Sequence, residues 1–192
     1  MAREGEPPSG DETGARNPFW DFSLAVWGRE AVEPACLDLQ ERHGLDVNLL
    51  LFCGWAGRRG RALDDADIAR LIEAARPWRE ATVVPLRKLR KWLKGQSAAP
   101  GATAGRLRER IKGDELQAEA IQQDLFVAVM PVPDGTGGPA VTVANMAAYF
   151  AALGIAPDAS DTAHLANVLR GCHPELLPLE AVWLLTGNTK DP

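Results

Sequence analysis

Hydrophobic residues recur every three or four positions along most of the chain, which is the spacing that places them on one face of an α-helix. Strand-like alternation of apolar and polar residues is not convincing anywhere, so the pattern predicts an all-α protein. Caps, prolines and glycines set the expected boundaries. We expect one helix to begin at residue 18 and others to span about 31–42, 47–56, 64–75, 77–94, 103–129, 141–153, 161–170 and 176–185.

The segment 47–56 differs from the other predicted helices because it is apolar on nearly all sides. A helix without a polar face is buried all round, so the other helices are expected to surround it. The sequence therefore predicts a compact bundle of six helices, in which the others surround a fully apolar central helix. Pro85 lacks a backbone N–H, and we expect it to kink or break its helix near Val84.

Composition divides the chain into four parts. Residues 1–15 combine Gly, Pro, Ser and acidic residues and predict a disordered leader. Residues 16–130 form the predicted bundle core. Residues 131–140 contain Pro and Gly at positions that suit neither helix nor strand, which is typical of a linker. Residues 141–187 are then a small C-terminal extension of short helices.

Three segments carry a family resemblance: FWDFSLAV at 19–26, ACLDLQ at 35–40 and GLDVNLLLFCGW at 44–55. Together with pieces at 78–79, 84–90 and 111–119, they resemble a family of uncharacterised bacterial proteins defined only as a domain of unknown function. The resemblance covers about residues 17–126. It implies a small, helical, cytoplasmic bacterial protein and carries no established activity.

Cysteine content and hydropathy favour the same location. The three cysteines are widely spaced and odd in number, which is typical of buried free thiols in a reducing cytosol. The N-terminus lacks the apolar segment of a secretory signal. No apolar run approaches the 20 or so residues that span a bilayer. We therefore expect a cytoplasmic protein without a membrane partner.

Charge is distributed unevenly along the 192 residues, whose formal net charge is −5. Residues 1–60 carry −4, residues 61–112 carry +7 and residues 113–192 carry −8. A basic hairpin at residues 87–112 is expected to bind phosphates or an acidic partner. Its predicted interaction surface consists of Arg87, Lys88, Lys91, Lys94, Arg106, Arg108, Arg110 and Lys112.

A second candidate site is a buried polar cluster inside the bundle. Glu115 and Glu119 lie one turn apart on one helix face, and ion pairs with Arg79, Arg87 or Arg90 are the simplest interpretation. Phosphate-loop, dinucleotide and zinc-ligand spacings are absent, so neither a cofactor nor a metal is predicted, and no catalytic residues are identified. The predicted cluster consists of Trp20, Asp21, Trp55, Arg79, Arg90, Glu115 and Glu119.

Three functional hypotheses follow. The first is a non-catalytic interaction or adaptor protein that presents the basic hairpin to an acidic protein or RNA. The second is an enzyme or small-ligand-binding protein with a polar pocket inside the bundle. In the third, the acidic C-terminal extension folds over the basic hairpin and covers it. The sequence leaves the partner and the oligomeric state open.

Overall fold

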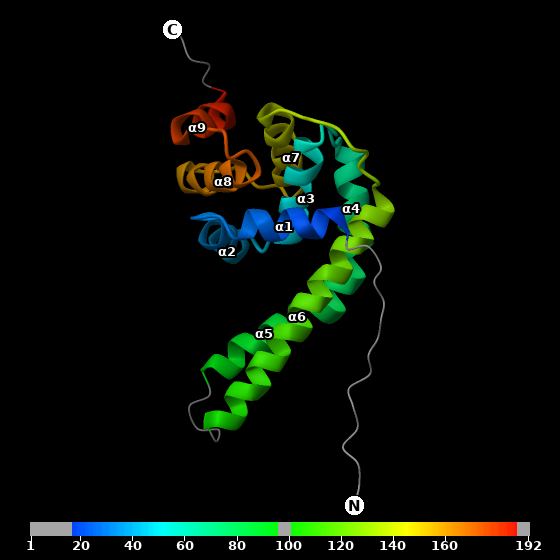
Figure 1. Ribbon diagram of the computed structural model, residues 1–192, viewed down its shortest axis with the longest axis vertical. Coiled ribbons are helices and arrows are strands. Elements are labelled where there is room, and N and C mark those ends of the chain that lie inside the picture. The colour runs from blue at the N-terminus through cyan, green and yellow to red at the C-terminus, as the bar shows by residue number, and fades with distance from the viewer. Residues whose placement is uncertain (1–16, 96–100, 188–192) are drawn as a thin grey trace, which may run out of the picture.

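A helix that is buried along nearly its whole length, α3 (Val47–Arg58), forms the centre of the fold (Figure 1). The computed structural model describes residues 17–95 and 101–187. Every α3 residue from 47 to 57 is buried. The Asp46 side chain begins the helix by accepting a hydrogen bond from the Asn48 N–H at 3.0 Å. This confirms the predicted central helix.

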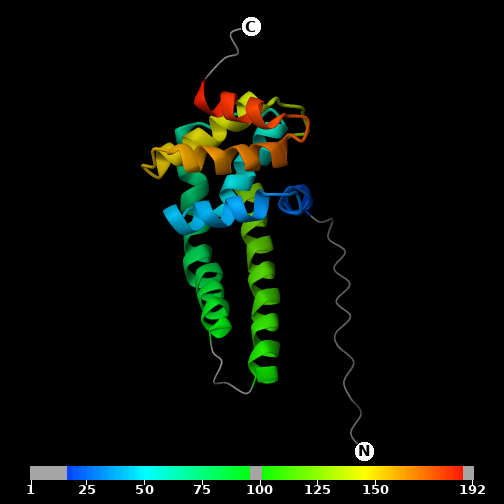
Figure 2. The same cartoon turned by 90° about the vertical axis from the view of Figure 1, so that its left-hand side faces the viewer.

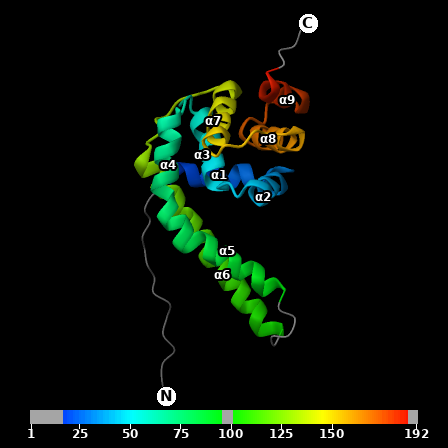
Figure 3. The ribbon, with the colours of Figure 1, turned by 180° about the vertical axis from the view of Figure 1, so that it is seen from behind.

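Helices from both earlier and later parts of the chain pack around α3 (Figures 1 and 3). No strand occurs among the described residues, which confirms the all-α class. The other helices are α1 (Pro18–Trp27), α2 (Val32–His43), α4 (Asp65–Trp78), α5 (Val84–Lys94), α6 (Gly101–Val129), α7 (Pro139–Ala152), α8 (Ala159–Cys172) and α9 (Pro178–Thr186). Of these, α1, α6, α7 and α8 pack directly on α3, and α9 packs on α8.

The hydrophobic core extends past residue 130 into the predicted C-terminal extension. Met146, Tyr149 and Phe150 of α7 are buried in the same cluster as the α3 side chains. Residues 131–138 contain no helix and connect α6 to α7. As a domain boundary the 131–140 linker stays a prediction, but α7 is an integral part of the packing around α3.

The chain winds continuously from α4 into α5 through one turn of π-helix, η1 (Arg79–Val83). The break expected between residues 75 and 77 is absent, because Pro77 is accommodated inside α4. The irregularity expected near Val84 takes the form of a π-turn, in which the Val84 N–H bonds to the Arg79 carbonyl. Pro85 has no N–H to donate, so it cannot contribute the next helical hydrogen bond after Val84.

α5 and the first half of α6 form an antiparallel pair that projects from the rest of the molecule (Figures 1 and 2). This pair contains the basic hairpin. None of the α5 residues is buried, although the helix has one strongly apolar face. The apolar face of α5 is therefore incompletely covered by its own chain.

Candidate functional site

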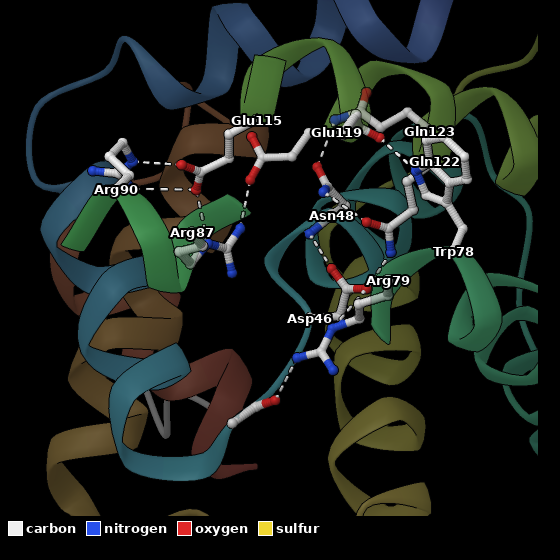
Figure 4. Close-up of polar contacts among 12 residues, drawn as sticks. Asp46, Asn48, Trp78, Arg79, Arg87, Arg90, Glu115, Glu119, Gln122 and Gln123 are labelled. Carbon is white, nitrogen blue, oxygen red and sulfur yellow. Dashed lines mark hydrogen bonds and ion pairs between the residues drawn. The ribbon is translucent and has the colours of Figure 1, made fainter. Parts of the chain in front are cut away.

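The base of the hairpin is held by four charged side chains, which we call the polar clamp: Arg87, Arg90, Glu115 and Glu119 (Figure 4). Glu115 is 5% exposed and accepts hydrogen bonds from Arg87 Nε at 3.0 Å and from Arg90 Nη2 at 3.2 Å. Arg90 Nε also bonds to Glu115, and Arg87 Nη2 bonds to Glu119. The predicted ion pairing of the two glutamates is confirmed for Arg87 and Arg90.

Arg79 pairs elsewhere. Its Nε lies 3.4 Å from Asp46 Oδ2, and its Nη2 donates to the Gly44 carbonyl at 2.8 Å. Asp46 also accepts a hydrogen bond from the Gln122 amide. Arg79 therefore connects the π-turn to the start of α3, next to the clamp but separate from it.

A series of hydrogen-bonded, buried side-chain amides leads from Asp46 and Gln122 toward α1 (Figure 4). Asn48 Nδ2 donates to Gln122 Oε1 at 3.3 Å, and Gln123 Nε2 donates to Asn48 Oδ1 at 2.8 Å. Ser23 Oγ then donates to Gln123 Oε1 at 2.9 Å. Gln122 and Gln123 were not predicted from the sequence, because two adjacent glutamines in a long helix are typical of an exposed face.

Burial affects the carboxylates differently. It raises the pKa of Asp46 despite the nearby Arg79 and Gln122, and it raises the pKa of Glu119 despite Arg87. Burial also opposes ionisation of Glu115, but the hydrogen bonds and charges of Arg90 and Arg87 outweigh it and lower the pKa of Glu115. Glu115 is thus the anionic centre of the clamp.

Three residues of the predicted polar cluster lie outside it. Trp55 packs in the core against Phe19 and Phe52, with the Arg59 guanidinium 4.9 Å from the centre of its ring. Asp21 is exposed on α1, since Phe19, Ser23 and Val26 form the buried side of that helix. Trp20 is half-buried, and its carbonyl accepts a hydrogen bond from Ser23. The predicted cluster is therefore wrong for Trp20, Asp21 and Trp55.

The polar groups at the base of the hairpin bind one another. Across the residues that the structure describes, Arg108 Nε is the one buried side-chain nitrogen or oxygen without a hydrogen-bond partner. Likewise, no group of three His, Cys, Asp or Glu side chains in those ranges is placed to hold a metal ion. Paired groups have few donors and acceptors left for a ligand, so this arrangement suits a structural clamp.

The predicted interaction surface is largely exposed. Lys88, Lys91 and Lys94 lie on the outside of α5, and Arg106, Arg110 and Lys112 lie on the outside of α6. Arg108 is half-buried, and its Nη1 lies 3.0 Å from Glu109 Oε1. Arg87 does not belong to this surface. It lies three residues before Arg90, so its 18%-exposed side chain faces α6 and the two clamp glutamates.

Large apolar side chains are exposed beside these cations. Leu89 and Leu107 are each 43% exposed, and Trp92 is 60% exposed. Leu86 and Leu93 are half-buried. The hairpin therefore presents leucine and tryptophan as well as positive charge.

The C-terminal extension does not cover the hairpin. α7 packs on α3 and α4, α8 packs on α1, α2 and α3, and α9 packs on α7 and α8. Figures 1 and 2 place these helices at the opposite end of the molecule from the tip of the hairpin. The hypothesis that the extension folds over the basic hairpin is therefore wrong for residues 139–187.

The helices within residues 17–95 and 101–187 all fall short of the length and apolar content that a membrane crossing needs. No curated protein and no solved structure shows significant similarity to the chain. A family described as "Protein of unknown function (DUF2390)" matches residues 18–126. This match covers more than half of the chain, from the start of α1 to near the end of α6. The chain belongs to the DUF2390 family of proteins of unknown function.

Proposed function

We propose that this protein is a non-catalytic binding protein that uses the basic hairpin to contact an acidic protein. The observation that carries the proposal is a concentration of positive charge that the described residues compensate only in part. Residues 87–112 contain nine basic residues and one acidic residue, Glu109. The two glutamates that face the hairpin, Glu115 and Glu119, are already engaged by Arg87 and Arg90.

Most of the remaining cations have no partner within the described chain. Five of them, namely Lys88, Lys91, Lys94, Arg110 and Lys112, form no ion pair with any residue that the structure describes. A row of unpaired cations creates a positive potential that attracts negative partners and speeds their association. We therefore expect binding that weakens as salt is added.

The exposed side chains favour a protein over RNA as the partner. Binding of single-stranded RNA uses several aromatic side chains on which bases stack. Trp92 is the single aromatic residue in 87–112, whereas leucines are exposed at 89 and 107. Exposed leucine and tryptophan next to arginine and lysine are typical of protein interfaces.

The test is affinity purification from the native cell at low salt, with and without ribonuclease. We expect wild-type protein to retain acidic proteins that resist ribonuclease and are released by salt. The variant Lys88→Glu/Lys91→Glu/Lys94→Glu should lose them. Partners that survive this triple reversal, or that disappear with ribonuclease, would overturn the proposal.

A single-site comparison controls for the change in total charge. Lys91→Glu reverses a cation on the hairpin, and Arg29→Glu reverses an exposed cation between α1 and α2. Both variants change the net charge by the same amount. We expect retention of acidic proteins to fall in the first variant and to stay at the wild-type level in the second.

A further inference from the structure

The two sides of the hairpin differ in chemistry, as helix geometry shows. Arg90 of α5 faces Glu115 of α6, and each residue turns a helix by about 100°. Around the α5 axis, Leu89 and Leu93 are rotated from Arg90 by about 100° and 60° in one direction. Lys91 and Lys94 are rotated from it by about 100° and 40° in the opposite direction. In a pair of antiparallel right-handed helices, take on each helix the residue that faces the other helix. Residues rotated from it in the same sense then lie on the same side of the pair.

The same arithmetic applies to α6. Leu107 lies about 80° from Glu115 in the sense that Leu89 has on α5, and Lys112 lies about 60° in the opposite sense. Leu89, Leu93 and Leu107 therefore share one side of the hairpin, which we call the apolar side. Lys91, Lys94 and Lys112 share the other side.

Cations border the apolar side along both edges. Trp92 lies about 160° from Arg90 at the outer edge of α5, and Lys88 is its neighbour about 40° further round. On α6, Arg110 and Arg106 lie about 140° and 180° from Glu115. Lys88, Arg106 and Arg110 are all exposed. An apolar strip between two basic edges is the complement of an amphipathic helix whose apolar stripe is flanked by acidic residues.

We infer that the apolar side is the docking face for an acidic amphipathic helix of the partner protein, an inference that rests on the proposed function. α5 has 11 residues and so offers a strip about 16 Å long, which matches about three turns of a partner helix. Leucine-type side chains of that helix would cover Leu89, Trp92 and Leu107. Its acidic residues would face Lys88, Arg106 and Arg110.

Charge favours this occupant over two others. A second copy of the chain would bring the unpaired cations of one hairpin against those of the other, which is repulsive. A lipid surface would have to accept Asp114, an exposed carboxylate that lies about 100° from Glu115 on the same side as Leu107. Burying that charge in hydrocarbon is unfavourable. A protein helix avoids the first cost, and a lysine or arginine opposite Asp114 would avoid the second.

The test is selection from a displayed library of helix-forming peptides of about 18 residues against the full-length protein. We expect enrichment of apolar residues spaced at i, i+3, i+4 and i+7 with Asp or Glu on both flanks. A synthetic peptide of the selected sequence should bind the wild-type protein. Its affinity should fall about tenfold or more in Leu89→Ser/Trp92→Ser, as expected for loss of an aromatic anchor. Leu24→Ser/Leu37→Ser removes two exposed leucines from the body and should bind as wild type.

The outcomes separate this inference from the proposed function. The selection could instead yield acidic peptides without an amphipathic pattern. If their binding is lost in Lys91→Glu/Lys112→Glu and kept in Leu89→Ser/Trp92→Ser, the inference is overturned and the proposed function stands. Failure to enrich acidic peptides would overturn both. Self-association of the protein that is lost in Leu89→Ser/Trp92→Ser would assign the apolar side to a second copy. Sedimentation with phosphatidylglycerol vesicles that is lost in the same variant would assign it to lipid. Either result would overturn the inference.

Discussion

Gly57 of α3 lies close to the backbone of α7. A Cβ atom at this position would sit 2.5 Å from the Thr142 Cα and 2.7 Å from the Thr142 backbone nitrogen. Backbone atoms in a packed helix cannot move aside cheaply, so Gly57→Ala must separate the two helices. We expect the variant to lose about 3 kcal/mol or more of the free energy of unfolding, measured by urea denaturation.

Gly113 supplies the matched control. It is an exposed glycine inside α6, and an added Cβ would meet no atom within 4 Å. Gly113→Ala should increase the free energy of unfolding by about 0.5–1 kcal/mol, because alanine favours the helix. Equal effects of the two substitutions would contradict the close packing of α3 on α7.

His173 gives the structure a dependence on pH. The ring is fully buried: its Nε2 lies 2.8 Å from Thr142 Oγ1, and its Nδ1 lies 3.2 Å from both Arg58 Nη1 and Glu175 Oε1. Burial, helped by the Arg58 charge, lowers the pKa of His173, although Glu175 opposes the shift. The unfolded chain is therefore protonated first as the pH falls below about 6.5, and this protonation destabilises the fold.

We expect the free energy of unfolding to decrease as the pH falls from about 6.5 to the lower pKa of the folded state. His173→Gln keeps a group that can bond to Thr142 but cannot titrate. Its free energy of unfolding should depend less on pH across this range, measured by urea denaturation at a series of pH values. Parallel pH profiles for the two proteins would show that His173 is not responsible.

At the scale of elements, the polar clamp fixes α5 against α6. Glu115→Leu removes the acceptor shared by Arg87 and Arg90 and leaves two half-buried guanidinium groups next to an apolar side chain. We expect a loss of about 2–3 kcal/mol in the free energy of unfolding, less than for a fully buried pair because both arginines can reach water. Hydrogen exchange of the α5 amides should become faster.

Glu109→Gln is the control for the clamp. Glu109 also pairs with an arginine, Arg108, but its side chain is 62% exposed. Exposed ion pairs contribute little, so this variant should stay within about 0.5 kcal/mol of the wild type. If hydrogen exchange in α5 is the same in both variants, the clamp does not determine the position of the hairpin.

The sequence predicted individual helices better than their contacts. Helical spacing located the central helix, and two glutamates one turn apart indicated the ion pairs of Glu115 and Glu119. The partners of Asn48 could not be predicted, because Gln122 and Gln123 are remote in sequence and polar. The π-turn was also missed, since Pro77 and Pro85 read locally as helix breaks.

At the scale of the whole molecule, α7 completes the cover around α3. A fragment of residues 1–130 lacks Met146, Tyr149 and Phe150, which belong to the main core. We expect this fragment to melt without a cooperative transition and to bind a hydrophobic dye, measured by circular dichroism and dye fluorescence. A cooperative melt near that of the full chain would instead support 131–140 as a domain boundary.

The position of α7 along the chain affects synthesis as well as stability. A ribosome completes α3 at Arg58 and must add about ninety more residues before α7 ends at Ala152. At about 5–20 residues per second, this takes roughly 5–20 s. During that interval a helix that is apolar on nearly every side lacks part of its final cover. Newly made chains should therefore depend on chaperones that bind exposed hydrophobic segments.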